Sequence, residues 1–214
     1  MKVLITAGPT QEPIDDVRYI TNASSGKMGA ALALEAMKRG YDVTLVHGPV
    51  VITLPECKKV SVRTTKEMVD AVMNELKKDY DVAISTAAIS DFAPEKVCGK
   101  IKSGKCIELR LEPTPKLIEQ VRDAYPDVFL VAFKAEYGLR KDELKSIAKD
   151  FLKKKNLDMV VANDVEKNQF GSDDNEIFIA CENAVKEFGK KSKTELAKNI
   201  WDEIELKTKK VCPA

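Results

Sequence analysis

Hydrophobic and polar positions alternate along this chain with two different periods. Short, nearly continuous apolar runs predict strands at residues 2–7, 42–46, 59–62, 82–88, 107–111, 128–133 and 158–162. Apolar residues at helical spacing predict helices at residues 30–39, 66–78, 115–124 and 141–154. Because strands and helices keep alternating, we expect the α/β class, with a Rossmann-like, doubly wound and mostly parallel sheet.

The end of the chain follows a different pattern. Residues 176–181 and 184–188 flank Glu182-Asn183 and predict an antiparallel β-hairpin. Residues 194–207 predict a terminal helix, with Ser192 before it as a candidate cap. The hairpin could be a dimer element or an edge ribbon that closes the core, and the sequence favours neither.

Composition limits the architecture and the partners. A chain of 214 residues with 44% hydrophobic content can bury one core, so we expect a single domain over residues 1–214. Lys and Arg number 35 against 34 Asp and Glu, which offers no overall attraction for nucleic acid or an anionic membrane. No apolar stretch approaches the length of about 20 residues that a membrane span needs. A cytoplasmic protein that binds neither nucleic acid nor membrane is expected.

Cysteine and histidine usage argues against several kinds of site. The five cysteines form no close C-x-x-C pair, and the single histidine, His47, stands beside Gly48-Pro49. Zinc-ligand spacing and a disulfide framework are therefore missing from the sequence. We expect reduced thiols and an ordinary loop histidine, and not a Ser-His-Asp or Cys-His enzyme.

The strongest chemical signal lies at residues 20–29, which read Ile-Thr-Asn-Ala-Ser-Ser-Gly-Lys-Met-Gly ahead of an apolar helical run. A helix start presents unpaired backbone N–H groups and a partial positive charge, and Ser, Lys and Gly suit the close approach of a phosphate. The alternative is an ordinary capped helix with Ser24 or Ser25 at the N-cap. The density of donors favours a nucleotide or a phosphorylated substrate.

Polar segments follow several predicted strands, where ligands bind in open α/β sheets. Residues 8–22 are too long for the first turn of a dinucleotide fold and lack G-x-G-x-x-G, which counts against an NAD enzyme. Asp91 could accept ribose hydroxyls or hold a metal, or be a simple turn residue. Residues 94–105 carry Lys96, Lys100, Lys102 and Lys105 with two glycines. That segment could be a lid over a triphosphate or a solvated surface loop.

Together these segments resemble one family. The matching blocks are Ile5-Thr-Ala-Gly-Pro-Thr, Glu12-Pro-Ile-Asp, Val17-Arg-Tyr-Ile-Thr-Asn-Ala-Ser-Ser-Gly-Lys-Met-Gly, Ala87-Ala-Ile-Ser-Asp-Phe, Lys100-Ile-Lys, Val161-Ala-Asn-Asp-Val and Phe170-Gly-Ser-Asp-Asp-Asn. They resemble phosphopantothenate–cysteine ligase of coenzyme A biosynthesis over nearly the whole chain. In many bacteria and archaea this ligase is fused behind a flavin-dependent decarboxylase. Here we expect a stand-alone enzyme or an excised domain.

The resemblance implies a two-step reaction. The carboxylate of 4′-phosphopantothenate attacks the α-phosphate of CTP, which forms an acyl-CMP and pyrophosphate, and the amine of L-cysteine then displaces CMP. The implied catalytic residues are Asn22, which contacts the acyl-nucleotide, and Lys100, which neutralises phosphates. Arg18 and Asn22 are the implied phosphopantothenate-binding residues, with Arg18 acting in its own or a neighbouring subunit's site. The resemblance also implies a homodimer and Mg²⁺, whose ligands the sequence does not identify.

The resemblance assigns a larger set to the nucleotide. Ser24, Ser25 and Gly26 would cradle phosphates, Asp91 would hold the ribose, and Lys155 would contact phosphate. The complete implied nucleotide-binding set is Ser24, Ser25, Gly26, Ala88, Asp91, Lys100, Thr114, Pro115, Lys116, Leu117, Phe133 and Lys155.

Two departures from the family pattern and three alternatives stay open. The family's Lys-x-Lys-Lys is broken after Lys102, and Phe151 stands where a second phosphate-binding lysine is usual. The prokaryote-like motifs favour CTP, with ATP as the alternative. A short-chain dehydrogenase-like oxidoreductase would need a Tyr-x-x-x-Lys pair, and Tyr137 with Lys141 has that spacing but falls in an expected loop. A non-catalytic nucleotide-binding module is the third possibility.

Overall fold

An eight-stranded sheet forms the centre of the molecule. The computed structural model describes residues 1–167, 170–182 and 184–208. The strands of the sheet are β1 (Lys2–Ala7), β4 (Asp42–His47), β5 (Lys58–Ser61), β6 (Val82–Ser85), β9 (Phe129–Glu136), β10 (Met159–Asp164), β11 (Asp174–Cys181) and β12 (Ala184–Ser192). Their spatial order is β12-β11-β10-β9-β6-β1-β4-β5. The six strands from β5 to β10 pair in parallel, and β11 and β12 are antiparallel.

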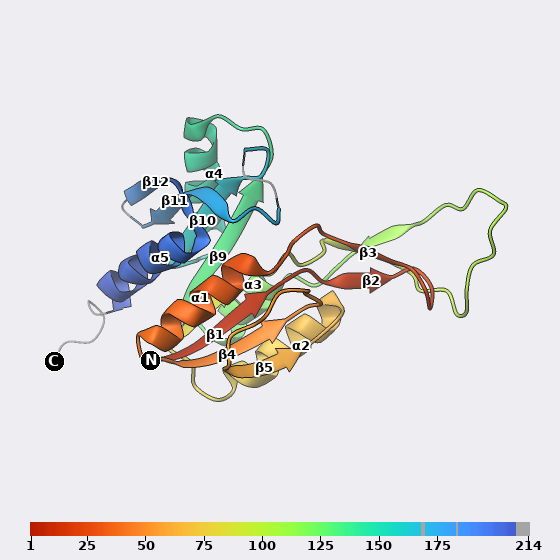
Figure 1. Ribbon diagram of the computed structural model, residues 1–214, viewed down its shortest axis with the longest axis horizontal. Coiled ribbons are helices and arrows are strands. Elements are labelled where there is room, and N and C mark those ends of the chain that lie inside the picture. Colours follow the sequence, from red (N-terminus) through yellow and green to blue (C-terminus); the bar gives the residue numbers. More distant parts are fainter. Residues whose placement is uncertain (168–169, 183, 209–214) are drawn as a thin grey trace.

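Helices cover both faces of this sheet (Figure 1). The helices α1 (Lys27–Lys38) and α5 (Lys193–Thr208) share one face, and α2 (Thr65–Leu76), α3 (Leu117–Ala124) and α4 (Lys141–Lys154) share the other. Side chains of a strand alternate between the faces, so Leu4 packs in one apolar layer while Val3 and Ile5 pack in the other. Because both faces of each central strand are buried, these strands read as continuous apolar runs in the sequence.

Local signals explain where individual helices begin. Thr64 caps α2 in a capping box with Glu67. Ser192 does the same for α5, because its Oγ accepts from the Glu195 N–H at 3.2 Å and its backbone N–H donates to the Glu195 carboxylate at 3.2 Å. The Ser192 cap predicted from sequence is therefore confirmed.

A two-ribbon arm projects from the sheet (Figure 1). It contains the short strands β2 (Gln11–Pro13), β3 (Tyr19–Thr21), β7 (Phe92–Pro94) and β8 (Leu111–Pro113), paired as β2-β3 and β7-β8. We call residues 11–21 and 92–113 the arm. Its two halves leave the sheet after β1 and β6, so segments 80 residues apart in sequence run outwards together.

The structure confirms the predicted fold class and most elements. The prediction of a core strand at residues 107–111 is wrong: Leu111 begins β8 in the arm, and Ile107 and Leu109 are exposed there. The strand predicted at 82–88 ends at Ser85, because residues 86–88 leave the sheet and Ala88 N–H donates to Gly8 O. The strands β2 and β3 were not predicted from the polar segment 8–22.

The C-terminal hairpin is built into the sheet edge, since β11 pairs with β10 as well as with β12. This is the edge ribbon of the two alternatives. Asn183, in the predicted turn, lies outside the described residues. Within residues 1–167, 170–182 and 184–208, no helix combines the length and apolar character needed to cross a bilayer.

Candidate active site

The strand order reverses between β1 and β6, and the chemistry-bearing segments gather beyond this point. Open α/β sheets bind ligands at such a switch point, past the carboxyl ends of the strands. A cleft of about 580 Å³, the large cleft, opens there between the ends of β6 and β9, the start of α3 and the end of α4. Its lining includes the predicted site residues Asn22, Ala88, Asp91, Thr114, Pro115, Lys116, Leu117, Phe133 and Lys155.

Ala88 is the point where the arm meets the large cleft. Its carbonyl oxygen accepts from the Asn22 side-chain amide at 3.0 Å and from the Thr10 N–H at 3.3 Å. Its own N–H donates to Gly8 O at 2.9 Å. The Asn22 side chain is therefore oriented at the rim of the cleft by the backbone that leads from β6 towards the second half of the arm.

Ion pairs line the large cleft. The Lys116 ammonium lies 2.5 Å from Asp91 Oδ1, and Lys155 pairs with Glu119. The hydrogen bond from Lys155 lowers the pKa of Glu119. Each of these two lysines, implied nucleotide ligands, thus faces a carboxylate that a triphosphate would have to displace. The carboxylate of Asp91, expected at the ribose, is held by Lys116.

Phe151, the departure from the family's second lysine, also lines the large cleft. The Lys134 ammonium lies 5.5 Å from its ring centroid and 2.9 Å from Glu136 Oε1. Lys134 follows the predicted strand at 128–133 and was missed because a single lysine beyond a strand carries no motif. Lys134 therefore places a positive charge beside Phe151, where the family usually has a lysine.

A second hollow of about 130 Å³, the small cleft, adjoins the large one. Ala87, Ala88, Phe133, Ala135 and Phe170 line both. Ser24, Ser25 and Gly26 line the small cleft, as expected for a site at the start of α1. Lys27, the lysine of the predicted anion-binding segment, also lines it, together with Asn163, Asn175 and Lys193, to which the sequence analysis gave no individual role.

The N-cap residue of α1 offers no capping side chain, and the one serine contact to the first residue of the helix is long, with Ser25 Oγ 3.5 Å from the Lys27 N–H nitrogen. The N-cap is Gly26, with φ of 77° and no capping hydrogen bond from a side chain, so neither Ser24 nor Ser25 is the N-cap. A side chain at Gly26 would place its Cβ 2.7 Å from Val50 Cγ1. Glycine is therefore required by both conformation and space. The first turn also contains no acidic residue, which favours the anion-site interpretation.

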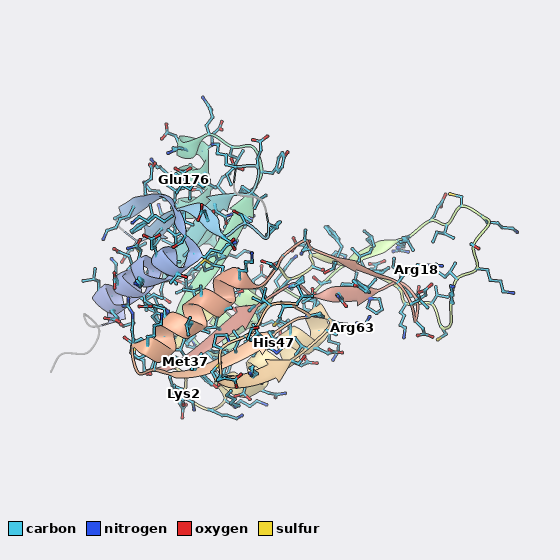
Figure 2. The ribbon with its side chains drawn as sticks, viewed as in Figure 1. Lys2, Arg18, Met37, His47, Arg63 and Glu176 are labelled. Atoms are coloured by element: carbon cyan, nitrogen blue, oxygen red, sulfur yellow. The ribbon has the colours of Figure 1, made fainter. Side chains whose placement is uncertain are left out.

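Two implied site residues lie on the arm and line neither cleft. Figure 2 shows Arg18 on the arm, away from the sheet, where its guanidinium pairs with Asp15 at 3.1 Å and donates to Ile101 O at 3.0 Å. Lys100 lies between Gly99 and Ile101, whose N–H groups donate to Asp16 and Asp15. In this conformation the lysine-bearing segment is tied to the β2–β3 turn and does not cover either cleft.

Asp15 holds the tip of the arm together. Its carboxylate, in a residue only 2% exposed, accepts from the N–H groups of Val17, Arg18 and Ile101. Burial opposes ionisation, but these three hydrogen bonds outweigh it and lower the pKa of Asp15. The tip therefore depends on an ionised carboxylate.

A buried polar network anchors the root of the arm. Glu12 Oε1 accepts from both the N–H and the hydroxyl of Thr65, at 2.9 and 2.7 Å. Thr65 Oγ1 lies 3.1 Å from Thr10 Oγ1, which accepts from the Ser90 N–H at 3.0 Å. These polar side chains are satisfied by one another across 80 residues of sequence, so no local pattern could identify the network.

The remaining sequence expectations concern groups outside the clefts. His47 ends β4, and its Nδ1 lies 2.9 Å from Gly48 O. Cys57, Cys98, Cys106 and Cys181 are free thiols, and Cys212 lies outside the described residues. Lys141 starts α4 and pairs with Glu176 and Glu187, whereas Tyr137 precedes that helix. The Tyr-x-x-x-Lys spacing therefore does not align on one helical face.

Comparison with known proteins identifies the family. Residues 1–207 match the model described as DNA/pantothenate metabolism flavoprotein C-terminal domain. The chain belongs to this family. It is 47% identical over 206 residues to the coenzyme A biosynthesis bifunctional protein CoaBC of Thermococcus kodakarensis, covering 95% of this chain and 51% of the relative. It is 36% identical over 215 residues to CoaBC of Escherichia coli, with 95% and 51% covered.

Solved structures of the family share the fold. The C-terminal domain of a coenzyme A biosynthesis bifunctional protein CoaBC matches with a TM-score of 0.82 and 32% identity, covering 98% of this chain and 96% of that one. The DNA/pantothenate metabolism flavoprotein from Streptococcus pneumoniae matches with a TM-score of 0.84 and 28% identity, covering 96% and 99%. The chain spans about half the length of the curated relatives that it matches. The resemblance stated from the sequence motifs is confirmed at the level of the family.

Proposed function

We propose that this protein is a phosphopantothenate–cysteine ligase that joins 4′-phosphopantothenate to L-cysteine through an acyl-CMP, acting in the cytoplasm. The observation that carries the proposal is the convergence of Asn22, a capless helix start and a lysine-lined cleft at the switch point of the sheet. Family membership and relatives named for coenzyme A biosynthesis support it.

The proposed chemistry needs positioning and charge neutralisation more than a proton-shuttling triad. In the first step a carboxylate oxygen of phosphopantothenate bonds to the α-phosphorus of CTP, and the bond to the pyrophosphate oxygen breaks. Lys116 and Lys155 exchange their carboxylate partners for phosphate oxygens. In the second step the cysteine amine attacks the acyl carbon, CMP leaves, and the amine proton goes to solvent. The Asn22 amide, held at the rim, orients the acyl group.

CTP as the nucleotide and Mg²⁺ as the cofactor are part of the proposal. No group of three or more His, Cys, Asp or Glu side chains that could hold a metal occurs among the described residues. Mg²⁺ needs no such cluster, because it keeps several waters and binds mainly through the phosphates of the substrate. Glu119 or Glu136, which line the large cleft, would supply a carboxylate ligand. When bound, Mg²⁺ would offset the charge of the triphosphate.

A homodimer completes the proposal. The exposed large hydrophobic side chains of the described residues number thirteen, of which Val17, Tyr19, Phe92, Val97, Ile107, Leu109 and Leu111 lie on the arm. Such a concentration of exposed apolar surface is typical of an interface. We propose that two arms pack together and bring Arg18 and Lys100 of one copy to the clefts of the other.

The test of the activity is pyrophosphate release with 4′-phosphopantothenate, Mg²⁺, L-cysteine and either CTP or ATP, beside reactions that lack each component. Release that requires phosphopantothenate and is faster with CTP supports the proposal. Faster release with ATP overturns the choice of base, and no release with either nucleotide overturns the ligase.

Changing Asn22 to Asp tests the second step. The carboxylate loses the donor to Ala88 O and cannot orient the acyl group, so we expect cysteine-dependent turnover to fall about 100-fold or more, in the range found when one positioned donor is removed. Nucleotide binding by calorimetry should stay within about threefold. Unchanged turnover would remove Asn22 from the mechanism.

A further inference from the structure

The large cleft contains a third lysine, Lys134, which has no part in the chemistry of the ligase as proposed. Lys134 lies near the end of β9, and its ammonium lies 2.9 Å from Glu136 Oε1. Residues two apart on a strand share a face, and both of these line the large cleft but not the small one. Their side chains are 34% and 28% exposed, so the pair belongs to the wall of the cleft and not to the open surface.

A second contact fixes the Lys134 ammonium. It lies over the ring of Phe151, 5.5 Å from the centroid, which is the geometry of a cation–π interaction. An aromatic face attracts a cation through its quadrupole and carries no net charge, so the ring holds the ammonium without neutralising it. Phe151 therefore supports a positive charge at a defined position in the cleft wall.

This position lies beside Lys155. Phe151 and Lys155 both line the large cleft and are four residues apart, at the end of α4 and at its C-cap. Side chains at this spacing are neighbours on one face of a helix, with Cβ atoms about 5–6 Å apart. The Lys134 ammonium over the Phe151 ring is therefore about one helical turn from Lys155. Two cations so placed suit neighbouring groups of one phosphate chain.

The charges of the large cleft form three pairs of one kind. The charged residues among the described ones that line it are Lys116 with Asp91, Lys155 with Glu119, and Lys134 with Glu136. Each ammonium thus has one carboxylate, and the charges of the cleft balance. A triphosphate carries several negative charges, and phosphate oxygens form strong charge-assisted hydrogen bonds with ammonium groups. Three exchangeable ammonium groups match this ligand better than two.

We infer that Lys134 binds the phosphate chain of the nucleotide, and that Glu136 and Phe151 hold its ammonium in position before the nucleotide arrives. On binding, the ammonium exchanges the Glu136 carboxylate for phosphate oxygens and keeps its contact with the ring. The inference rests on the proposed function for the nature of the ligand, a nucleoside triphosphate.

Calorimetric titration of the full chain with CTP, ATP and CMP, in the absence of phosphopantothenate, tests the inference without turnover. Lys134→Met removes the charge but keeps an unbranched stem against Phe151, and Lys134→Arg keeps the charge. A double variant, Lys134→Met with Phe151→Lys, moves the charge from β9 to α4. Lys149→Met is the matched control, because Lys149 is exposed on α4 and lines neither cleft.

We expect Lys134→Met to weaken binding of the preferred triphosphate about tenfold or more, as the loss of a hydrogen bond from a charged group implies. Lys134→Arg and the double variant should both bind it about threefold or more tightly than Lys134→Met, and Lys149→Met should stay within about twofold of the wild type. An equal loss for CMP assigns Lys134 to the α-phosphate, and a loss confined to the triphosphates assigns it to the outer phosphates.

Melting temperatures show whether each variant folds, and Lys134→Gln decides by the same criterion should Lys134→Met fail to fold. The inference is overturned when the folded variant without the charge binds the triphosphate within about twofold of the wild type. It is also overturned when the double variant binds no more tightly than Lys134→Met, because the phosphates then do not pass the Phe151 ring. A wild type that binds neither CTP nor ATP overturns the proposed function itself, and pyrophosphate release tests the ligase separately.

Discussion

The sheet and the arm are held together by different forces. The sheet lies between two apolar layers in which side chains such as Leu32, Trp201 and Met68 have no exposed surface. The arm instead relies on the Asp15 carboxylate at its tip and the Glu12 network at its root, while apolar side chains face outwards. Apolar burial therefore stabilises the sheet, whereas the arm is held by polar contacts and leaves apolar side chains exposed.

This contrast separates stability from function. Hydrophobic burial scales with area and stabilises the whole fold cooperatively. Hydrogen bonds at a projecting tip stabilise a local conformation that can open without global unfolding. Substitutions in the sheet should change the free energy of unfolding, and substitutions in the arm should change activity and local exchange.

The largest effect is expected from Trp201→Ala. Trp201 is fully buried between α5 and α1, and its Nε1 donates to Leu32 O at 3.0 Å. Removing the indole leaves a cavity and an unpaired carbonyl, so we expect a loss of about 3–5 kcal/mol in the free energy of unfolding, measured by urea denaturation. Ile107→Ala on the arm should cost less than about 0.5 kcal/mol in the same assay at concentrations where the protein is monomeric. Equal losses would remove the distinction between the regions.

Lys100→Gln on the arm should lower activity and leave the stability of the fold unchanged. Loss of one phosphate-directed charge is expected to lower kcat/KM for the nucleotide about tenfold, or roughly 1.4 kcal/mol, with the melting temperature unchanged. The matched control is Lys38→Gln at the exposed end of α1, which should leave kcat/KM unaltered. Pyrophosphate release at the wild-type rate would show that Lys100 has no role in activation.

Asp15→Asn should loosen the arm alone. The neutral side chain loses the ion pair with Arg18 and is a weaker acceptor for the Ile101 N–H. We expect amide hydrogen exchange at residues 97–101 to become about tenfold faster, with core strands unaffected. Asp70→Asn, which removes an exposed ion pair with Lys66 on α2, is the control. Faster exchange throughout β1 and β6 would mean that the arm unfolds together with the sheet.

The smallest effect is an acid dependence of the sheet. Burial opposes the ionisation of Glu75, but hydrogen bonds from Lys58, Lys78 and Tyr80 lower its pKa to about 2. A depressed pKa in the folded state stabilises the protein above the ordinary value near 4.3, and this contribution is lost as pH falls from about 4.3 towards 2. Its size is modest because both lysines are about half exposed.

Melting temperatures of the wild type and Glu75→Gln across this range measure the contribution of Glu75. We expect the variant to be less stable at neutral pH and the difference to shrink in acid. A constant difference would exclude Glu75 as the titrating group.

Much of the site was predictable because its signals are local. Glycine, serine and amide residues before an apolar helix predict an anion site at the helix start, and Ser24, Ser25 and Gly26 line the small cleft there. The capping of that helix by Gly26, and not by a serine, was not predictable, since it follows from close contact with Val50.

The sequence by itself determined the layered α/β fold, because apolar periodicity reports which faces of each element are buried. It also determined the family, through motifs that follow the strands. Only the tertiary structure decided that residues 11–21 and 92–113 form one arm, that Arg18 and Lys100 lie away from the clefts, and that Lys27 and Lys193 line the same cleft. Those facts depend on contacts between segments separated by 80 residues or more, which no local pattern encodes.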